Sequence, residues 1–368
     1  MNESMKTTRA LGLCSGGLDS ILSALVLRRQ GIEVEWVTFE TPFFSADNAR
    51  KASERTGVPL SVVNFTGTYL EMLLNPPFGY GQNMNPCPDC HALMFRTAGA
   101  MMREKGFDFL FSGEVAGQRP MSQNTSSLRY VEKHSGFDGY VVRPLSAKNL
   151  PITIPETEGL VDREKLLDFS GRSRKPQMML AEEFGIFEYP SPAGGCLLTE
   201  KVYSERLYDY FIHLPKKDAP VNSNKKPAIP SFVLKIRKEG LEPLDLSVID
   251  PSHVCESDLH LLKNGRHFRL ESGVKVIVGR NKADNDCIQK YADPTRDVLM
   301  KTSGFSGPIG VVSGKASRED LLFAAEMLIS YSKVPEEKEP LVMMEFNGEK
   351  STAPAQGVSP DKLKPFMV

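Results

Sequence analysis

The sequence predicts an α/β protein in which a doubly wound parallel sheet is followed by a smaller α+β domain. Two observations support this prediction. The first part of the chain alternates short apolar runs with amphipathic stretches, which is typical of a parallel sheet covered by helices on both faces. After a segment rich in Pro and Lys, the pattern changes to paired strands with short helices between them.

Composition places the chain among ordinary globular proteins. It has 368 residues, 40% of them hydrophobic, and 45 Lys and Arg against 46 Asp and Glu give a net charge of −1. These values suit two or three domains and exclude a disordered, collagenous or coiled-coil protein. The sequence contains no apolar stretch near the ~20 residues of a membrane span and no N-terminal signal pattern. We therefore expect a soluble, cytoplasmic protein without a membrane partner, and the sequence leaves a homo-oligomer open.

Apolar runs predict five strands in the N-terminal part. A helix is predicted after the first strand, because the apolar residues Leu18, Ile21, Leu22 and Leu25 have i, i+3, i+4 and i+7 spacing. A second helix is expected to begin after an N-cap at Ser45, and a third to follow Cys90. The predicted strands are Ala10–Cys14, Val34–Phe39, Leu60–Phe65, Phe107–Ser112 and Gly139–Leu145.

The C-terminal part is predicted to begin with a β-hairpin that turns at Ser272-Gly273. A helix starting at Asn281 follows, then strands near Asp297–Thr302 and Pro308–Ser313. Ser317 and Asp320 resemble a capping box at the start of another helix. The predicted organisation is a first domain at 1–213, a linker at 214–230, an α+β domain at 231–348 and a loose tail at 349–368.

The segment Cys14–Ser20 reads Cys-Ser-Gly-Gly-Leu-Asp-Ser and lies between the first strand and the first helix. Its glycines let the backbone approach an anion, and the N–H groups of the helix N-terminus favour negative charge. No Lys follows the glycines, so this is not a Walker P-loop. Asp19 instead places a carboxylate beside the expected phosphates, which is tolerable only if a cation such as Mg²⁺ intervenes. The alternative is a Gly-rich turn without a ligand.

This segment resembles the pyrophosphate loop of the ATP-pyrophosphatase (PP-loop) family. The resemblance implies a sheet of PP-loop/HUP type and cleavage of ATP between its α and β phosphates. A substrate oxygen then carries AMP while pyrophosphate leaves into the loop. It also implies that adenine lies near Thr38–Glu40, and that ATP is bound by Ser15, Gly16, Gly17, Asp19 and Ser20.

Three cysteines can share one site. Cys87 and Cys90 form a C-x-x-C before the third helix, and Cys196 follows two glycines much later in the chain. A C-x-x-C at a helix start can offer two thiolates to one metal. Taken alone, the motif is equally open to a half zinc site, a redox pair or two packed thiols. Cys14, Cys255 and Cys287 are interpreted as small buried side chains.

Within PP-loop proteins, this cysteine pattern resembles the thiouridine synthetases that hold a [4Fe–4S] cluster on three cysteines, here Cys87, Cys90 and Cys196. The resemblance implies that the fourth iron carries an exchangeable sulfide. A second mechanism of that superfamily, with one Cys as a persulfide and another that releases the sulfur through a disulfide, fits Cys87 and Cys196 and stays open. We expect the cluster, because we find no rhodanese-like sulfur carrier in the sequence.

Further motifs narrow the resemblance to the catalytic domain of tRNA 4-thiouridine synthetase, over residues 9–200. They include Ser112–Gln118, Cys87-x-x-Cys90-His91 and Arg143-Pro144-Leu145. By this resemblance Gly113 and Gln118 bind the nucleotide, and Glu114, Ser122 and Gln123 lie where they reach the nucleotide or the target base. The alternative is a solvated polar loop. The family's Asp-Lys is Lys148-Asn149 here, which puts the role of that pair in doubt.

Residues of about 265–315 resemble the NFACT-R domain, an RNA-associated module. The resemblance rests on Val278-Gly279-Arg280-Asn281, on Asn285-Asp286 and on Ala292-Asp293-Pro294 with Asp297. Four basic residues are candidate phosphate contacts, although such charges often form only a solvated face. They are Arg280, Lys282, Arg296 and Lys301.

Together these features predict an ATP-dependent tRNA sulfurtransferase that releases AMP and pyrophosphate. Its expected cofactors are ATP, Mg²⁺ and a [4Fe–4S] cluster, and its expected partners are tRNA and a donor of sulfide or sulfur. Asp19 on the metal, Cys196 and Cys87 are the candidate catalytic residues. Two alternatives stay open: a PP-loop enzyme acting on a small molecule, and a non-catalytic RNA-binding protein with a structural zinc. The sequence does not distinguish 4-thio from 2-thio products or identify the uridine.

Overall fold

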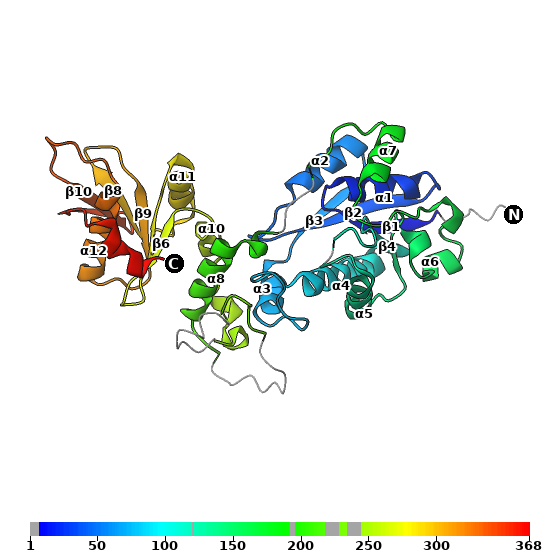
Figure 1. Ribbon diagram of the computed structural model, residues 1–368, viewed down its shortest axis with the longest axis horizontal. Helices are drawn as coiled ribbons and strands as arrows, with labels where there is room; N and C mark the ends of the chain where they lie inside the picture. The colour runs from blue at the N-terminus through cyan, green and yellow to red at the C-terminus, as the bar shows by residue number, and fades with distance from the viewer. Residues whose placement is uncertain (1–6, 120, 192–195, 218–227, 234–243) are drawn as a thin grey trace. The chain divides into compact units, whose positions relative to one another are not determined.

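A computed structural model describes residues 7–119, 121–191, 196–217, 228–233 and 244–368 (Figure 1). These residues fall into two compact units. The first contains the described residues up to Thr199 together with 228–233 and 244–247, and the second contains 200–217 and 248–368. Within the described part of the chain, no helix combines the length and the apolar composition needed to cross a membrane.

The first unit is built on a parallel sheet of five strands in the order β3-β2-β1-β4-β5. The prediction of a doubly wound sheet is confirmed, and all five predicted strands form. Strand β1 lies between β2 and β4, so the strand order reverses there, and ligands of such sheets bind beyond the carboxyl ends of the strands at that point. The strands are β1 Arg9–Leu13, β2 Glu33–Glu40, β3 Leu60–Asn64, β4 Phe109–Ser112 and β5 Val141–Val142.

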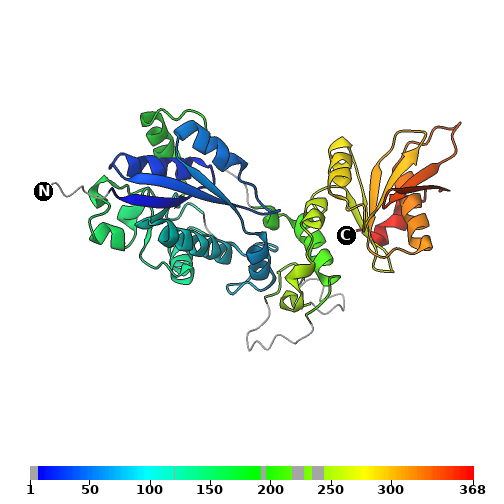
Figure 2. The ribbon, with the colours of Figure 1, turned by 180° about the vertical axis from the view of Figure 1, so that it is seen from behind.

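Helices cover both faces of this sheet. Figures 1 and 2 show α1, α2 and α7 on one face and α4 and α5 on the other. The unit also contains three short 3-10 helices, η1 Ala147–Asn149, η2 Arg163–Lys165 and η3 Leu197–Thr199. The α-helices are α1 Leu18–Arg28, α2 Asp47–Thr56, α3 Thr66–Leu74, α4 Cys87–Lys105, α5 Thr125–Ser135, α6 Ile154–Thr157 and α7 Lys175–Glu183.

Two helix starts differ from the predictions. The N-cap of α2 is Ala46 rather than Ser45, whose hydroxyl donates instead to the carboxylate of Asp47 at 2.9 Å. Helix α4 begins at Cys87 instead of after Cys90. Its Pro88 is tolerated because the first helical turn needs no N–H donor there. Both cysteines of the C-x-x-C therefore lie in the first turn of a helix.

The second unit contains an antiparallel sheet of six strands in the order β11-β10-β8-β9-β7-β6. The predicted hairpin forms, with Gly273 at φ +86° in its turn. The helix predicted to start at Asn281 begins one residue later, at Lys282, with Asn281 as its N-cap, and the predicted capping box of Ser317 and Asp320 is confirmed. The strands are β6 Arg266–Arg269, β7 Lys275–Val278, β8 Val298–Ser303, β9 Ile309–Ser313, β10 Leu341–Phe346 and β11 Glu349–Pro354. The main helices are α10 Glu256–Leu261, α11 Lys282–Tyr291 and α12 Arg318–Ser330.

Helix α8, Lys201–Ile212, belongs with the second unit, although the boundary expected from the sequence lay after residue 213. The guanidinium of Arg206 donates to the carbonyl oxygens of Leu262 and Gly265 at 3.1 and 3.0 Å. The carboxylate of Asp209 accepts from Arg269 and Lys275, each at 2.6 Å. These buried contacts join α8 to the antiparallel sheet. Most of the predicted linker, 218–227, lies outside the described residues.

The last twenty or so residues are not the loose tail that composition predicts. Strand β11 pairs with β10 along its whole length, and helix α13, Pro360–Leu363, buries Leu363 completely. The ring of Phe366 lies 5.2 Å from that of Phe323 on α12. A few well-placed apolar side chains thus order a segment whose average composition is polar.

Candidate active site

The loop between β1 and α1 makes a tight turn at Gly16 that lies against the backbone of α2. Gly16 has φ +73°, and a Cβ atom there would lie 2.2 Å from the carbonyl carbon of Asn48 in α2. Only glycine fits at this position. The hydroxyl of Ser20 donates to the carbonyl of Gly17 at 2.8 Å, and no described side chain caps the N-terminus of α1. Its first N–H groups are therefore the donors that an anion would use.

Asp19 is the buried carboxylate of this loop. Its Oδ2 accepts from the Nε2 of Gln118 at 2.9 Å, and Gln118 in turn accepts from the Nε2 of Gln177 at 3.1 Å. Oδ1 is buried and has no hydrogen-bond partner among the described residues. Burial raises the pKa of Asp19, and the bond from Gln118 and the charge of Arg174 oppose that shift. An orphaned carboxylate oxygen at a phosphate loop fits a site for a cation such as Mg²⁺.

Gly113 joins the end of β4 to the start of α1. A Cβ atom at Gly113 would lie 2.4 Å from the carbonyl carbon of Asp19, so the two backbones are in direct contact. Strands β1 and β4 are parallel neighbours, and the loops after them therefore leave the same edge of the sheet. The structure thus brings together Asp19, Gly113 and Gln118, all three of which the sequence predicted to lie at the nucleotide.

The three cysteines of the predicted cluster also come together. The hydroxyl of Tyr69 hydrogen-bonds to the thiol of Cys90, while burial and the nearby thiols of Cys87 and Cys196 raise the pKa of Cys90. Two hydrogen bonds hold the segment after Cys196 against the approach to α4. The Nδ2 of Asn83 donates to the carbonyl of Thr199 at 2.6 Å, and the N–H of Met84 donates to the carbonyl of Leu198 at 3.2 Å.

These thiols do not form a ready ligand set. All six cysteines, each of which the structure describes, are thiols rather than disulfides. Across the described residues, no three His, Cys, Asp or Glu side chains are placed to hold a metal ion. Gly194 and Gly195, the two glycines that precede Cys196, lie outside the described residues. The donor chemistry suits an iron–sulfur cluster, and the assignment of the cluster stays a prediction.

Cys87 is the start of a chain of charged groups that runs from the partly exposed Cys87 and His91 to the buried Glu114 and Arg143. Cys87 and His91 are one helical turn apart on α4 and hydrogen-bond to each other. The Nδ1 of His91 lies 3.0 Å from Oε1 of Glu114, and Oε2 of Glu114 accepts from the Nε of Arg143 at 3.0 Å. Arg143 also donates to Glu132 at 2.6 Å. The chain ends at a buried guanidinium shared by two carboxylates.

The pKa values along this chain favour ionised groups. Burial alone would raise the pKa of Cys87, but the hydrogen bond and charge of His91 lower it below its ordinary value. The pKa of His91 rises to about 10 against the effect of burial, because both Cys87 and Glu114 accept from it. Despite burial, the charge of Arg143 and the bond from His91 lower the pKa of Glu114 to about 2. The arrangement stabilises a thiolate paired with an imidazolium.

A short loop connects the two halves of the site. Gln118 binds Asp19, and Ser122 hydrogen-bonds to the thiol of Cys87. Four residues of chain span at most ~14 Å between their α-carbons. The hydrogen bond from the N–H of Gly117 to the carbonyl of Gln123, at 2.7 Å, closes the loop further. The loop Gly117–Gln123 therefore connects the carboxylate of Asp19 to the thiol of Cys87 through Gln118 and Ser122.

Other predicted residues have structural partners. Thr38–Glu40 ends β2, and Glu40 pairs with Arg50 of α2 at 3.5 Å. Lys148 donates to the carbonyl of Glu164 at 2.9 Å, and Asn149 donates to the carbonyl of Asp168. Lys148 and Asn149, which stand where the family has Asp-Lys, thus bind backbone carbonyl groups of the segment 164–168.

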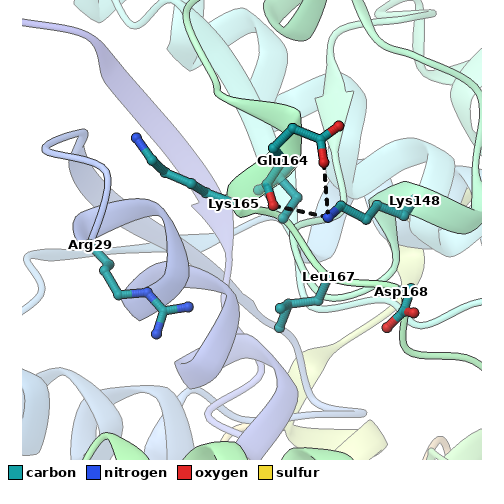
Figure 3. A pocket seen from close by; sticks show the side chains of 7 residues that line it. Arg29, Lys148, Glu164, Lys165, Leu167 and Asp168 are labelled. Carbon is teal, nitrogen blue, oxygen red and sulfur yellow. Dashed lines mark hydrogen bonds and ion pairs between the residues drawn. The ribbon is translucent and has the colours of Figure 1, made fainter.

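A cavity of about 570 Å³ lies away from this site (Figure 3). It includes Arg29, the C-cap of α1, whereas Asp19 is at the other end of that helix. Its basic side chains already have acidic partners, since Lys148 pairs with Glu164 and Arg29 with Glu183. The cavity is therefore a charged surface groove rather than the nucleotide site. Figure 3 labels Arg29, Lys148, Glu164, Lys165, Leu167 and Asp168 along it.

In the second unit, two of the four candidate phosphate contacts are committed to carboxylates. Arg280 pairs with Asp284 at 2.7 Å, and Arg296 binds both Asp258 and Asp297. Lys282 is exposed and Lys301 is half-buried. Arg280 and Arg296 therefore act in the fold, a role that their charge alone did not reveal. Cys255 is likewise exposed instead of buried, because it caps the short helix α10.

Sequence reasoning assigned no role to His91, Tyr69 or Arg143, which the structure places around the cysteines. One signal was available for His91, because it lies four residues after Cys87 in a helix and so shares a face with it. The bond between Arg143 and Glu114 joins residues 29 positions apart, and neither side chain carries a local signal for it.

Known proteins resemble the two parts of the chain separately. Residues 6–149 match the family described as Thiamine biosynthesis protein (ThiI), and residues 265–367 match the NFACT protein RNA binding domain. The tRNA-specific 2-thiouridylase MnmA of Dichelobacter nodosus is 25% identical over 222 residues, which are 55% of this chain and 55% of that protein. The same enzyme of Methylobacterium nodulans is 24% identical over 163 residues, 39% of this chain and 43% of that protein. The chain spans about half the length of these curated relatives, or less.

Two solved structures overlap with the chain at low scores. A predicted subunit of tRNA methyltransferase from Methanocaldococcus jannaschii covers 54% of this chain and 88% of its own, with 17% identity and a TM-score of 0.35. The C-terminal part of the fibronectin/fibrinogen-binding protein from Streptococcus suis covers 32% and 63%, with 15% identity and a TM-score of 0.25. These scores are too low to support a functional comparison. Residues 6–149, which contain the loop Cys14–Ser20, are thus similar to the ThiI family, and residues 265–367 are similar to the NFACT RNA-binding domain.

Proposed function

We propose that this protein is an ATP-dependent tRNA sulfurtransferase that converts a uridine to a thiouridine. The ThiI-family domain, the RNA-binding domain and the thiouridylases among its relatives support this proposal. One structural observation carries it. The loop Gly117–Gln123 binds Asp19 through Gln118 and Cys87 through Ser122, at the edge of the sheet where such enzymes bind ligands.

The chemistry begins with activation of a poor leaving group. A uracil carbonyl oxygen attacks the α-phosphorus of ATP, and the bond from that phosphorus to pyrophosphate breaks. The N–H groups at the start of α1, which no described side chain caps, would stabilise the charge of the departing pyrophosphate. A Mg²⁺ ion held on Asp19 would supply further charge stabilisation. A sulfur nucleophile then attacks the activated carbon, the C–O bond breaks, and AMP leaves.

For the sulfur nucleophile we propose a [4Fe–4S] cluster held by Cys87, Cys90 and Cys196. Three thiols from two distant segments lie near one another, and no fourth cysteine is involved. A cluster bound through three cysteines would supply an iron open to an exchangeable sulfide. Tyr69, which hydrogen-bonds to Cys90, would help to close the site from water.

A persulfide on Cys87 is the second candidate, and a specific observation favours it. His91 lowers the pKa of Cys87, and the described residues contain no preformed metal ligand set. In this route a donor that carries a persulfide passes its outer sulfur to the thiolate of Cys87 and leaves as a thiolate. The terminal sulfur on Cys87 then attacks the activated carbon and AMP leaves. Cys196 then attacks Sγ of Cys87, which forms a disulfide and releases the sulfur on the uridine. An external thiol reductant must reduce that disulfide before the next turnover.

Mass spectrometry of tRNA nucleosides tests the function. Cells that lack this protein should lose one thionucleoside, and expression of the wild-type chain should restore it. An unchanged set of thionucleosides would reject tRNA thiolation and favour a small-molecule substrate. The missing nucleoside would also distinguish a 4-thio from a 2-thio product. Cys196→Ser should fail to restore it while ATP binding persists.

Anaerobic purification distinguishes the sulfur carriers. About four irons and four sulfides per chain, lost in Cys196→Ser, are expected for the cluster. A sulfur adduct on Cys87 in an iron-free, active protein would support the persulfide route. Zinc without iron, in a protein that does not thiolate tRNA, would support the non-catalytic alternative.

A further inference from the structure

Three aromatic rings form a patch beside the cysteine site. The rings of Phe78 and Tyr130 meet edge to face with centroids 4.8 Å apart, and Tyr130 stacks on His134 at 3.9 Å. Phe78 is 55% exposed, which is unusual for a side chain of its size and apolar character. We call these three side chains the aromatic patch.

Asp89 fixes this patch to the cysteine motif. It lies between Cys87 and Cys90, is only 5% exposed, and is thus a buried carboxylate. Its Oδ2 accepts from the backbone N–H of Phe78 at 2.8 Å, and its Oδ1 accepts from the hydroxyl of Tyr130 at 2.7 Å. One carboxylate therefore uses both oxygens to hold an exposed ring and its neighbour in place.

Two exposed basic residues lie next to His134, one in space and one along the chain. Arg96 of α4 donates to the backbone carbonyl of His134 at 2.7 Å, and its side chain is exposed. Lys133, next to His134 at the end of α5, is exposed as well. Exposed aromatic rings flanked by cations are the surface on which unpaired bases stack while phosphates are neutralised.

We propose that the aromatic patch, with Phe78 as its exposed ring, stacks an unpaired base of the substrate RNA beside the cysteines. This inference rests on the proposed function. A base inside a stacked helix cannot present its carbonyl oxygen to ATP, so the RNA must be opened around the target. A stacking surface anchored by the residue between two candidate sulfur ligands would hold the opened strand at the site. The combination of rings and cations favours RNA over a protein partner.

The test uses the full-length protein and compares Phe78→Ala with Phe78→Trp. The control is Phe187→Ala, because Phe187 is 77% exposed in the same unit and makes no ring contact among those the structure describes. The measurements are the Kd for an unmodified tRNA transcript, kcat/KM for tRNA in thiolation, and the KM for ATP.

Phe78→Ala should raise the Kd for tRNA about 5- to 100-fold and lower kcat/KM by a similar factor, since one base–aromatic stack is lost. The KM for ATP should stay within twofold of wild type. Phe78→Trp should keep binding near wild type because its ring still stacks, and Phe187→Ala should match wild type. A mere packing role for Phe78 would lower the melting temperature and leave tRNA binding intact.

Two outcomes overturn the inference. If wild type thiolates tRNA and Phe78→Ala binds tRNA as tightly as Phe187→Ala, the patch does not stack a base, while the proposed function stands. In that case, if Phe78→Ala loses thiolation activity only when a protein supplies the sulfur, the patch binds that donor protein instead of RNA. If wild type neither binds nor thiolates tRNA, the proposed function fails, and this inference fails with it.

Discussion

Gly113 packs so closely on Asp19 that a Cβ atom at position 113 would lie 2.4 Å from the carbonyl carbon of Asp19. The contact joins the loop after β4 to the first turn of α1, and Glu114, the next residue, binds His91. The contact between Gly113 and Asp19 therefore connects the loop Cys14–Ser20 with the group of residues around Cys87 and His91.

The first prediction concerns this contact. Gly113→Ala should destabilise the first unit, because the new Cβ would clash with the backbone of Asp19. Backbone atoms in a helix cannot move aside as a flexible side chain can. The expected cost is about 1–3 kcal/mol, a fall in melting temperature of roughly 3–10 °C. Gly67→Ala is the control, since a Cβ at Gly67 meets nothing within 4 Å. Scanning calorimetry of both variants measures the difference, and an equal effect of the two would contradict the close packing.

The second prediction separates stability from function at Asp19. Its pKa in the folded protein is raised above the ordinary 3.8, chiefly by burial. The protonated carboxyl of Asp19 therefore stabilises the fold at low pH, and this contribution is lost as the pH rises through the folded pKa. At pH 7 the ionised carboxylate lowers the free energy of unfolding. Asp19→Asn removes this cost, so its melting temperature at pH 7 should equal or exceed that of wild type.

The same variant should lose its response to Mg²⁺ and ATP. Thermal shift assays with and without both ligands should raise the melting temperature of wild type but not of Asp19→Asn. The stability gap between the two proteins should also narrow as the pH falls toward 4. A variant that still gains stability from Mg²⁺ and ATP would show that the orphaned oxygen is not the cation ligand.

The third prediction concerns the thiolate at Cys87. In metal-free protein, the rate at which iodoacetamide alkylates Cys87 should rise with pH and show its inflection below 9.0, the ordinary thiol value. His91→Gln removes the group that lowers this pKa and leaves burial, which raises it. The inflection should therefore move to higher pH. Peptide mass spectrometry monitors Cys87 alone, and labelling of the exposed Cys255 should not differ between the two proteins.

The fourth prediction tests the attachment of α8. Asp209 is buried between Arg269 and Lys275, and their bonds and charges lower its pKa below 3.8 despite burial. Its stabilising effect is present above pH 3.8 and is lost as the pH falls through the lower folded value. Asp209→Asn should cost the second unit about 3–5 kcal/mol at pH 7, because two cations stay buried.

Glu345→Gln provides the comparison for Asp209→Asn. Glu345 pairs with Lys350 at 3.8 Å on the exposed surface, where an ion pair contributes at most about 1 kcal/mol. Urea denaturation of both variants at pH 7 and near pH 3 measures the two effects. A loss in Asp209→Asn that is no larger than in Glu345→Gln would contradict the role of α8 in the second unit.

The sequence predicted the parts of this protein whose signals are local. Strands such as β4 are buried along their whole length, so they appear as unbroken apolar runs. The turn at Gly16 and the capping box at Ser317 depend on residue types within a few positions. Three cysteines were expected to meet because a family resemblance linked them, and spacing alone would not have joined Cys196 to Cys87.

The parts that sequence reasoning missed depend on contacts between distant residues. Arg296 was predicted only as a candidate phosphate contact, and nothing in its sequence context indicated that Asp258 and Asp297 bind its guanidinium. Helix α8 precedes the expected boundary, yet Arg206 and Asp209 attach it to the antiparallel sheet of the second unit. Neither pairing leaves a periodic pattern or a turn residue in the sequence. The role of a charged side chain is decided by its partner, which only the folded chain reveals.

The loop Gly117–Gln123 connects the side chain that binds Asp19 with the side chain that binds the thiol of Cys87. A group bound at Asp19 must either accept the side chain of Gln118 as a neighbour or displace it. Any displacement has to be absorbed before Ser122, four residues on, whose hydroxyl touches the thiol of Cys87. If ATP binds at Asp19 as proposed, its binding would change the surroundings of the Cys87 thiol through this loop.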